Sequence, residues 1–247
     1  MRSLWLSLIL VAAAGAAGCR AKQPADRSPD SAQISVTPPS APQSAPQIGP
    51  TSAPAAADSR PLLVCFGDSL TAGHGTDPGE SYPDYLQKDL DARGFRYHVV
   101  NQGISGNTTK DGLDRVDHII ALHPSLVVVE FGGNDGLRGL RIEDTRSNLD
   151  ALLSRLKTSG AKIALAGITL PPDYGPDYIH QFQQTYALLA KKYSVPLLPF
   201  LLEGVYGVDG MMQEDRTHAT ARGNEIVARN VLGLVAPHLK PEQQPRH

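Results

Sequence analysis

From Leu62 onward, short and continuously apolar runs alternate with amphipathic stretches of helical length. Strands are predicted at 62–66, 97–101, 126–129, 163–168 and 196–199, and helices near 82–93, 110–122, 144–159, 178–193 and 221–236. Runs that are apolar along their whole length, and not at alternate positions, indicate a parallel sheet covered on both faces. The pattern therefore predicts one α/β domain over residues 61–240, a three-layer α/β/α sandwich around a five-stranded parallel sheet.

The N-terminal residues have a different character. Arg2, the apolar residues 4–11 and the small residues 12–18 are typical of an export signal, which we expect over residues 1–18. The Ala-Ala-Gly sequence before Cys19 resembles the bacterial lipobox, in which the signal is removed before a cysteine that becomes lipid-modified. Ordinary cleavage at an Ala-x-Ala-like site, with Cys19 incidental, is the alternative. Either reading predicts an exported bacterial protein, periplasmic or in the cell envelope, and lipidation of Cys19 would attach it to a membrane.

A proline-rich segment separates this signal from the predicted domain. Between residues 20 and 60, eight of 41 residues are proline, and most of the others are Ala, Ser, Gln or Thr. Such a composition buries too little apolar surface to offset the entropy lost on ordering. We therefore expect a disordered tether over residues 19–60, and a polar tail over residues 241–247.

Composition excludes several classes of function. The formal net charge is −2 with 19% charged residues, which is unlike the basic surface of a nucleic-acid-binding protein. Outside the first 18 residues there is no apolar run long enough for a transmembrane helix. The two cysteines cannot form a disulfide scaffold or a four-cysteine zinc site. These features predict a soluble globular domain, which we expect to be monomeric.

Polar residues and glycines follow each predicted strand. In parallel sheets, ligands bind where loops leave the carboxyl ends of the strands. The loops carry Gly67-Asp68-Ser69-Leu70, then the run 101–106 (Asn-Gln-Gly-Ile-Ser-Gly), the run 131–136 (Phe-Gly-Gly-Asn-Asp-Gly) and finally Asp215-Arg216-Thr217-His218. One serine, one asparagine, several glycines and an Asp/His pair are thus expected at one edge of the sheet.

These residue types suit acyl transfer. A serine such as Ser69 is a weak nucleophile unless a base lies within hydrogen-bond reach, and His218 can take and return a proton near neutral pH. Asp215, three residues before His218, is close enough to fix the imidazole tautomer. Gly103 allows close approach of backbone to a ligand, and Asn134 offers an amide donor for a developing oxyanion.

Together the motifs resemble the four blocks of the SGNH (GDSL) hydrolases over about residues 62–235. The resemblance implies a flavodoxin-like sandwich in which Ser69 is the nucleophile and Asp215 and His218 complete the triad. It also implies an oxyanion hole made by the Ser69 N–H, the Gly103 N–H and the Asn134 side chain, with no metal or organic cofactor. Residues 132–139, 171–175 and 195–200 resemble in particular the bacterial acyl-CoA thioesterases, lysophospholipases and arylesterases.

Other residues near these motifs have more ordinary interpretations. Asp68 is expected to stabilise the turn, and Asp135 to have a structural role. Glu130 lies inside an apolar strand, so it should have a hydrogen-bonding partner there. His74 is the main rival base, and Cys65 is expected to be a packed thiol. The pair Asp215 and His218 could also ligate a metal, but no further ligand cluster accompanies it.

The sequence thus predicts a serine esterase that hydrolyses acyl esters or thioesters, such as aryl or alkyl esters, acyl-CoA and lysophospholipids. A carbohydrate or glycan O-acetylesterase would use the same triad and differ only in its acceptor pocket. A non-catalytic lipoprotein that binds lipid with this fold is the alternative from a different class. The partner would be a small-molecule substrate, with no nucleic acid, and contact with a membrane only through the lipid anchor.

Overall fold

The computed structural model describes residues 58–240. The predicted signal segment, Cys19, nearly all of the predicted tether and the C-terminal tail 241–247 lie outside the described residues. Within residues 58–240, no helix is long and apolar enough to cross a membrane. The description below concerns this part of the chain alone.

Strands and helices alternate along the described chain as the apolar pattern predicts. The order is β1 (Leu62–Gly67), α1 (Ser69–Ala72), α2 (Tyr82–Ala92), β2 (His98–Gly103), α3 (Thr109–Ala121), β3 (Leu126–Glu130), α4 (Gly133–Leu137), α5 (Ile142–Thr158), β4 (Lys162–Ala166), the 3-10 turn η1 (Pro172–Tyr174), α6 (Pro176–Tyr193), β5 (Leu197–Leu198), α7 (Ala221–Val235) and η2 (Ala236–His238). The short helices α1 and α4 were not predicted, because one turn shows no apolar periodicity.

The five strands form one parallel sheet in the order β2-β1-β3-β4-β5, which confirms the predicted sheet. The central strands β1 and β3 carry the most continuous apolar runs and are almost wholly buried. The edge strand β2 is half-buried, and β5 at the other edge has only two residues.

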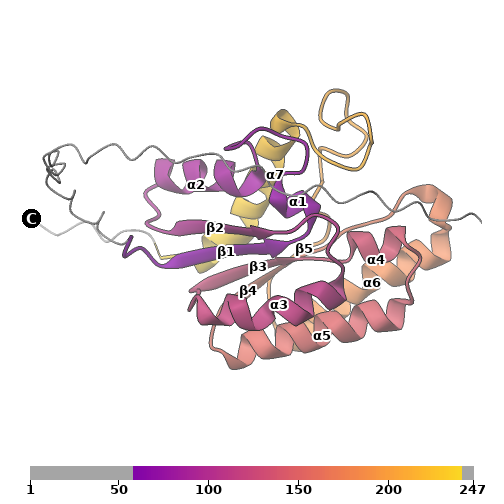
Figure 1. Ribbon diagram of the computed structural model, residues 1–247, viewed down its shortest axis with the longest axis horizontal. Helices are drawn as coiled ribbons and strands as arrows, with labels where there is room; N and C mark the ends of the chain where they lie inside the picture. The colour runs from indigo at the N-terminus through magenta and orange to yellow at the C-terminus, as the bar shows by residue number, and fades with distance from the viewer. Residues whose placement is uncertain (1–57, 241–247) are drawn as a thin grey trace, which may run out of the picture. The chain divides into compact units, whose positions relative to one another are not determined.

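Helices cover both faces of the sheet and complete the predicted sandwich (Figure 1). Helices α2 and α7 lie together on one side, and α3, α5 and α6 lie on the other. Leucines and other apolar side chains at helical spacing face the sheet, for example Leu86 and Leu90 of α2 and Leu149 and Leu153 of α5. The core therefore consists of two apolar layers, one on each side of the strands.

Side-chain caps fix where the helices begin. Ser81 and Asp84 form a capping box at α2, in which each side chain bonds the backbone N–H of the other residue. Thr108 and Asp111 do the same at α3, and Thr220 accepts from the Gly223 N–H at α7. Each cap satisfies N–H groups that the first helical turn leaves unpaired, so the loops that precede these helices have defined end points.

The strands are added on opposite sides of β1, which creates a topological switch point between β1 and β3. Strand β2 lies on one side of β1, while β3, β4 and β5 follow on the other, as in flavodoxin-like folds. Strands β2, β1 and β3 end level with one another, because Gly67 of β1 pairs with Gly103 of β2 on one side and with Glu130 of β3 on the other. The loops that leave these strands therefore begin next to one another, at the position where ligands bind in such folds.

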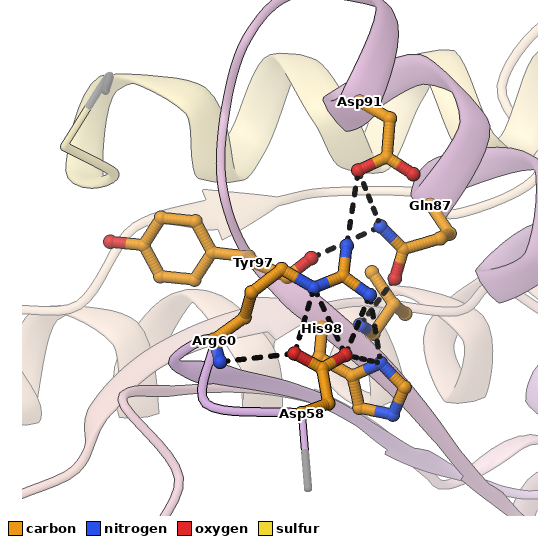
Figure 2. Close-up of polar contacts among 7 residues, drawn as sticks. Asp58, Arg60, Gln87, Asp91, Tyr97 and His98 are labelled. Carbon is orange, nitrogen blue, oxygen red and sulfur yellow. Dashed lines mark hydrogen bonds and ion pairs between the residues drawn. The ribbon is translucent and has the colours of Figure 1, made fainter. Parts of the chain in front are cut away.

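The opposite end of the sheet is anchored by a polar cluster around Arg60 (Figure 2). The Arg60 guanidinium bonds the Asp58 carboxylate at 2.7 Å and the Asp91 carboxylate of α2 at 3.2 Å. Gln87 of α2 accepts a hydrogen bond from the Val99 N–H at 2.7 Å and donates one to the Asp91 carboxylate at 3.0 Å. Residues just before β1 are thus attached to α2 and β2 at the end of the sheet away from the predicted site.

Candidate active site

Ser69 is the first residue of α1 and lies immediately beyond the end of β1. Asp68 caps this one-turn helix, because its Oδ1 accepts from the Leu70 N–H at 3.0 Å. The turn between strand and helix is so tight that a Cβ on Gly67 would lie 2.1 Å from the Thr71 hydroxyl oxygen. A glycine at position 67 is therefore needed to place Ser69 at the edge of the sheet.

His218 comes from the C-terminal part of the chain, in the loop before α7, and its side chain contacts Ser69. Its Nε2 lies 2.8 Å from the Ser69 Oγ, and its Nδ1 lies 2.7 Å from Oδ2 of Asp215. A carboxylate only accepts hydrogen bonds, so Nδ1 carries the proton and Nε2 is left to accept from the serine hydroxyl. The three predicted triad residues therefore form one chain of hydrogen bonds.

Asp215 is held as a carboxylate by its own loop. Its Oδ1 accepts from the N–H groups of Thr217 at 2.9 Å and His218 at 3.0 Å. Partial burial acts to raise the pKa of Asp215, but the hydrogen bonds from the His218 side chain and from these two N–H groups outweigh it and lower the pKa to about 2. Asp215 is therefore negatively charged at any pH near neutrality and can stabilise a protonated His218.

His74, the rival base, lies beside the imidazole of His218 and not beside the serine. The two ring centroids are 4.5 Å apart, and His74 Nδ1 lies 3.4 Å from the Ser105 hydroxyl. Only His218 makes a hydrogen bond with Ser69 Oγ among the described residues. The geometry therefore favours His218 as the base.

Asn134, in the first turn of α4, extends its amide toward the same place. Its Nδ2 donates to Asp68 Oδ2 at 3.2 Å and to the Asn107 carbonyl at 3.0 Å. The neighbouring Asp135 is buried and points the other way, where it accepts from the N–H and the hydroxyl of Thr109. This contact attaches α4 to the start of α3, so Asp135 has the structural role predicted for it and helps to position Asn134.

The structure does not bring Gly103 to this site in the way predicted. Strand β2 continues through Gly103, whose N–H donates to Oδ1 of Asn101 at 2.9 Å. Gly103 packs so closely on α1 that a Cβ would lie 2.2 Å from the Ala72 nitrogen. Gly106, three residues later, lines the cavity described below, and its N–H donates no hydrogen bond within residues 58–240. Of these two glycines, it is therefore Gly106 that lines the cavity together with Ser69.

Two buried carboxyl groups lie beneath the serine. Oε2 of Glu130 accepts from the Thr71 hydroxyl at 2.8 Å and the Asp68 N–H at 3.3 Å, which are the structural partners expected for it. Burial raises the pKa of Glu130 well above its usual value and that of Asp68 to about 6. Glu130 therefore supports both ends of the turn that carries Ser69, and burial favours its neutral form.

A cavity of about 310 Å³ opens over the serine. Its polar wall includes Ser69, Asn134 and His218, and the rest is mostly apolar. The apolar part comes from α4 and from the loops after β4 and β5, namely Leu137, Ile168, Leu170, Pro171, Phe200, Leu202 and Tyr206. Such a cavity suits a ligand with a carbonyl at one end and a hydrocarbon chain at the other.

Two further features concern the chemistry available here. Cys65 is fully buried on β1, and burial raises its thiol pKa to about 12, so it is the packed thiol that was expected. Within the described part of the chain, no group of three or more His, Cys, Asp or Glu side chains is placed to hold a metal ion. The groups that meet at the cavity are a hydroxyl, an imidazole, a carboxylate and amide donors.

This fold and arrangement define an acyl hydrolase that uses serine as the nucleophile. A sequence profile described as the GDSL-like Lipase/Acylhydrolase family matches residues 65–226. The chain belongs to this family.

Individual relatives agree with the assignment. The chain is 43% identical to the protein named Esterase TesA of Pseudomonas aeruginosa over 75% of this chain and 90% of that protein. It is 38% identical to Thioesterase 1/protease 1/lysophospholipase L1 of Escherichia coli over 70% of this chain and 81% of that protein. The crystal structure of TesA superposes with a TM-score of 0.70 at 42% identity, covering 72% of this chain and 99% of that one. These comparisons confirm the predicted family and fold.

Proposed function

We propose that the protein hydrolyses acyl esters or thioesters through an acyl-enzyme on Ser69. The observation that carries this proposal is the hydrogen-bonded chain from Asp215 through His218 to Ser69, which opens on an apolar cavity. The names of the relatives, which include an esterase and a thioesterase/lysophospholipase, support the same class of substrate.

The reaction proceeds in two halves on these residues. As the Ser69 Oγ attacks the substrate carbonyl carbon, its proton passes to Nε2 of His218, and the carbonyl oxygen becomes an oxyanion. His218 then returns the proton to the departing alcohol or thiol, which leaves the acyl group on Ser69. A water molecule, deprotonated by His218, attacks the acyl-enzyme, and the fatty acid leaves as Ser69 recovers its proton.

Three N–H donors would stabilise the oxyanion. The Ser69 N–H and the Gly106 N–H donate no other hydrogen bond within the described residues, and both residues line the cavity. The Asn134 amide is the third donor, and it would turn one hydrogen from Asp68 or the Asn107 carbonyl toward the oxyanion. Gly106 takes the oxyanion role predicted for Gly103, because the Gly103 N–H already donates to Oδ1 of Asn101.

The oxyanion role of Asn134 predicts a change in kcat with little change in KM. Asn134→Ala removes a donor that acts mainly in the transition state, so kcat should fall by about 10²–10³-fold. Steady-state kinetics with p-nitrophenyl butyrate would measure both constants. Gln181→Ala on α6, which removes an exposed side-chain amide outside the cavity lining, is the matched control. A variant in which only KM changes would contradict the role.

A panel of substrates tests the proposed function itself. The panel includes p-nitrophenyl esters of graded chain length, an acyl-CoA, a lysophospholipid and acetylated xylan. The apolar cavity predicts that esters with chains longer than acetyl are hydrolysed with the higher kcat/KM. Activity confined to acetylated xylan would identify a carbohydrate O-acetylesterase, and binding without hydrolysis of any ester would identify a lipid-binding protein.

We further propose that the protein is an exported monomer anchored through lipid on Cys19, with residues 19–57 as the tether. This proposal rests on the sequence of the first 60 residues. Cys19→Ser should move the enzyme from membrane pellets to the soluble fraction and leave kcat unchanged, because Cys19 lies outside the described catalytic domain. Mass spectrometry of the wild-type N-terminus supplies the control, and an unlipidated, soluble wild-type protein would refute the anchor.

A further inference from the structure

Asp68 has two carboxyl oxygens, and each has a different partner. Oδ1 accepts from the Leu70 N–H at 3.0 Å and caps α1, whereas Oδ2 accepts from the Asn134 amide at 3.2 Å. A helix cap needs only one acceptor, and the hydroxyl of a serine supplies it about as well as a carboxylate does. The cap therefore does not explain the second oxygen of Asp68, whose partner is the side chain proposed to stabilise the oxyanion.

The Asn134 amide can turn either of two different atoms toward the substrate. Its Nδ2 donates hydrogen bonds, and its Oδ1 only accepts them. Rotation of the amide by about 180° would place Oδ1 against the Asp68 carboxylate and would remove the donor from the oxyanion. A negatively charged acceptor beside the amide disfavours that arrangement, because the two oxygens repel each other. The position of Asp68 therefore selects the orientation of Asn134 that can stabilise an oxyanion.

The two acceptors that hold Asn134 differ in strength. A hydrogen bond to a carboxylate is roughly twice as strong as one to a neutral acceptor. The bond to Asp68 should therefore be kept, and the bond to the Asn107 carbonyl is the weaker of the two. When substrate binds, the hydrogen now donated to Asn107 would turn to the substrate oxygen, while Asp68 keeps the amide in place. This division of roles requires that Asp68 is charged.

A second buried carboxyl group lies next to Asp68. Oε2 of Glu130 accepts from the Asp68 N–H and the Thr71 hydroxyl, but Oε1 is buried and makes no hydrogen bond within residues 58–240. A charged carboxylate with one oxygen left unpaired would be costly in this position. A neutral carboxyl can carry its proton on that oxygen. Glu130 is therefore the neutral member of the pair, and the negative charge lies on Asp68.

The pKa values agree with this distribution of charge. Burial, and then the negative charge of Asp68, raise the pKa of Glu130 well above its usual value. Burial also raises the pKa of Asp68, but hydrogen bonds from its neighbours and the charge of His218 limit the rise to about 6. Asp68 is thus mostly ionised at neutral pH. The positive charge that His218 gains from the serine proton favours the ionised form further.

We propose that Asp68 is a positioning residue that orients the oxyanion donor Asn134, and that neutral Glu130 beside it keeps the negative charge on Asp68. Asp68 would thus act on an amide as Asp215 acts on the imidazole of the base, by fixing which of two alternative atoms faces the reacting groups. This inference rests on the proposed function, because it requires that Asn134 stabilises the oxyanion.

Asp68→Asn tests the orientation of the oxyanion donor. The new amide can still cap α1 through its oxygen, but its nitrogen would face the Asn134 nitrogen, donor against donor. We expect kcat for p-nitrophenyl butyrate to fall by about 10–10²-fold with KM little changed, which is part of the loss expected for Asn134→Ala. Asp68→Ser, which keeps a capping oxygen and lacks the second acceptor, should give the same pattern. Thermal unfolding would show that both variants are folded.

A double-mutant cycle separates the orientation of Asn134 from support of the turn that carries Ser69. If Asp68 acts through Asn134, the loss caused by Asp68→Asn disappears when residue 134 is already alanine. The double variant should therefore match Asn134→Ala in kcat to within about twofold. Losses that multiply would show that Asp68 supports only the turn, and they would overturn the inference.

Glu130→Gln tests the neutral carboxyl. Glutamine has nearly the same shape and carries no charge, so kcat should stay within about twofold of the wild-type value. A loss as large as that of Asp68→Asn would overturn the distribution of charge within the pair. Asp144→Asn, an equivalent change at an exposed carboxylate in the first turn of α5, is the control and should leave kcat and KM unchanged.

The outcomes also separate this inference from the function on which it rests. An active enzyme in which Asp68→Asn keeps the wild-type kcat would overturn the inference alone. An Asn134→Ala protein with the wild-type kcat would overturn the oxyanion role of Asn134, and the inference with it. A wild-type protein that hydrolyses no ester or thioester would overturn the proposed function itself.

Discussion

Replacement of Ser69 by alanine is expected to lower kcat/KM for every ester substrate by about 10³-fold or more. The change removes the only hydroxyl that bonds His218 within the described residues, so no acyl-enzyme can form. Because Ser69 is half-buried and its hydroxyl bonds only His218, the melting temperature should change little. Steady-state hydrolysis of p-nitrophenyl esters and thermal unfolding would measure the two effects.

A fluorophosphonate probe supplies the complementary measurement. It should label the wild-type protein at Ser69 alone, and the Ser69→Ala protein should remain unlabelled. Ser154→Ala, on the exposed part of α5, removes a hydroxyl outside the cavity and is the matched control. Labelling of a different serine, identified by peptide mass spectrometry, would show that the nucleophile has been misassigned.

The second large effect is expected from His218→Ala, which should reduce kcat nearly as much as loss of Ser69. Without the imidazole, no group accepts the serine proton or returns it to the leaving group. Asp215→Asn should be milder or comparable, because Asp215 sets the tautomer and stabilises the imidazolium without itself transferring the proton. The kcat of each variant on one p-nitrophenyl ester is the measurement.

His74 provides the internal control for this assignment. Its ring lies 4.5 Å from that of His218, so it is the histidine best placed to substitute. His74→Ala should therefore lose far less activity than His218→Ala. A His218→Ala protein that stays active, and loses that activity when His74 is also replaced, would identify His74 as the base.

Much of this site could be predicted because a parallel sheet brings its loops together. Ser69, Asn134 and His218 are far apart along the chain, but each lies in the segment that follows a strand at the carboxyl edge of the sheet. The structure brings all three to one cavity. The interpretation of Asp135 as structural also follows from its neighbours, since its carboxylate accepts from the start of α3.

Gly103 is the predicted site residue that the structure places in a strand and not in the cavity. The strand was predicted to end at residue 101, which placed Gly103 in the loop, but β2 continues through it in register with Gly67. Two extra strand residues move the loop onward, so that Gly106, and not Gly103, lines the cavity over Ser69. Apolar patterning defines the middle of a strand well and its ends poorly, because residues at the ends are only partly buried.

The loop between β5 and α7 could not have been predicted in this way. Its residues 206–216 have no apolar periodicity and form turns closed by local hydrogen bonds. The positive φ of Arg216 is a property of that closure and has no signature in the residue type. Only the folded loop shows that Tyr206 and Arg216 line the cavity over Ser69.

Ser69 and His218 are separated by 149 residues, and this distance along the chain has a consequence for when activity first appears. Contacts between residues so distant in sequence form late, after the intervening segments have found their places. A growing or partly folded chain that lacks the loop before α7 holds a serine with no base. We therefore expect the polypeptide to be inert toward esters until the loop that carries His218, and helix α7 after it, have docked.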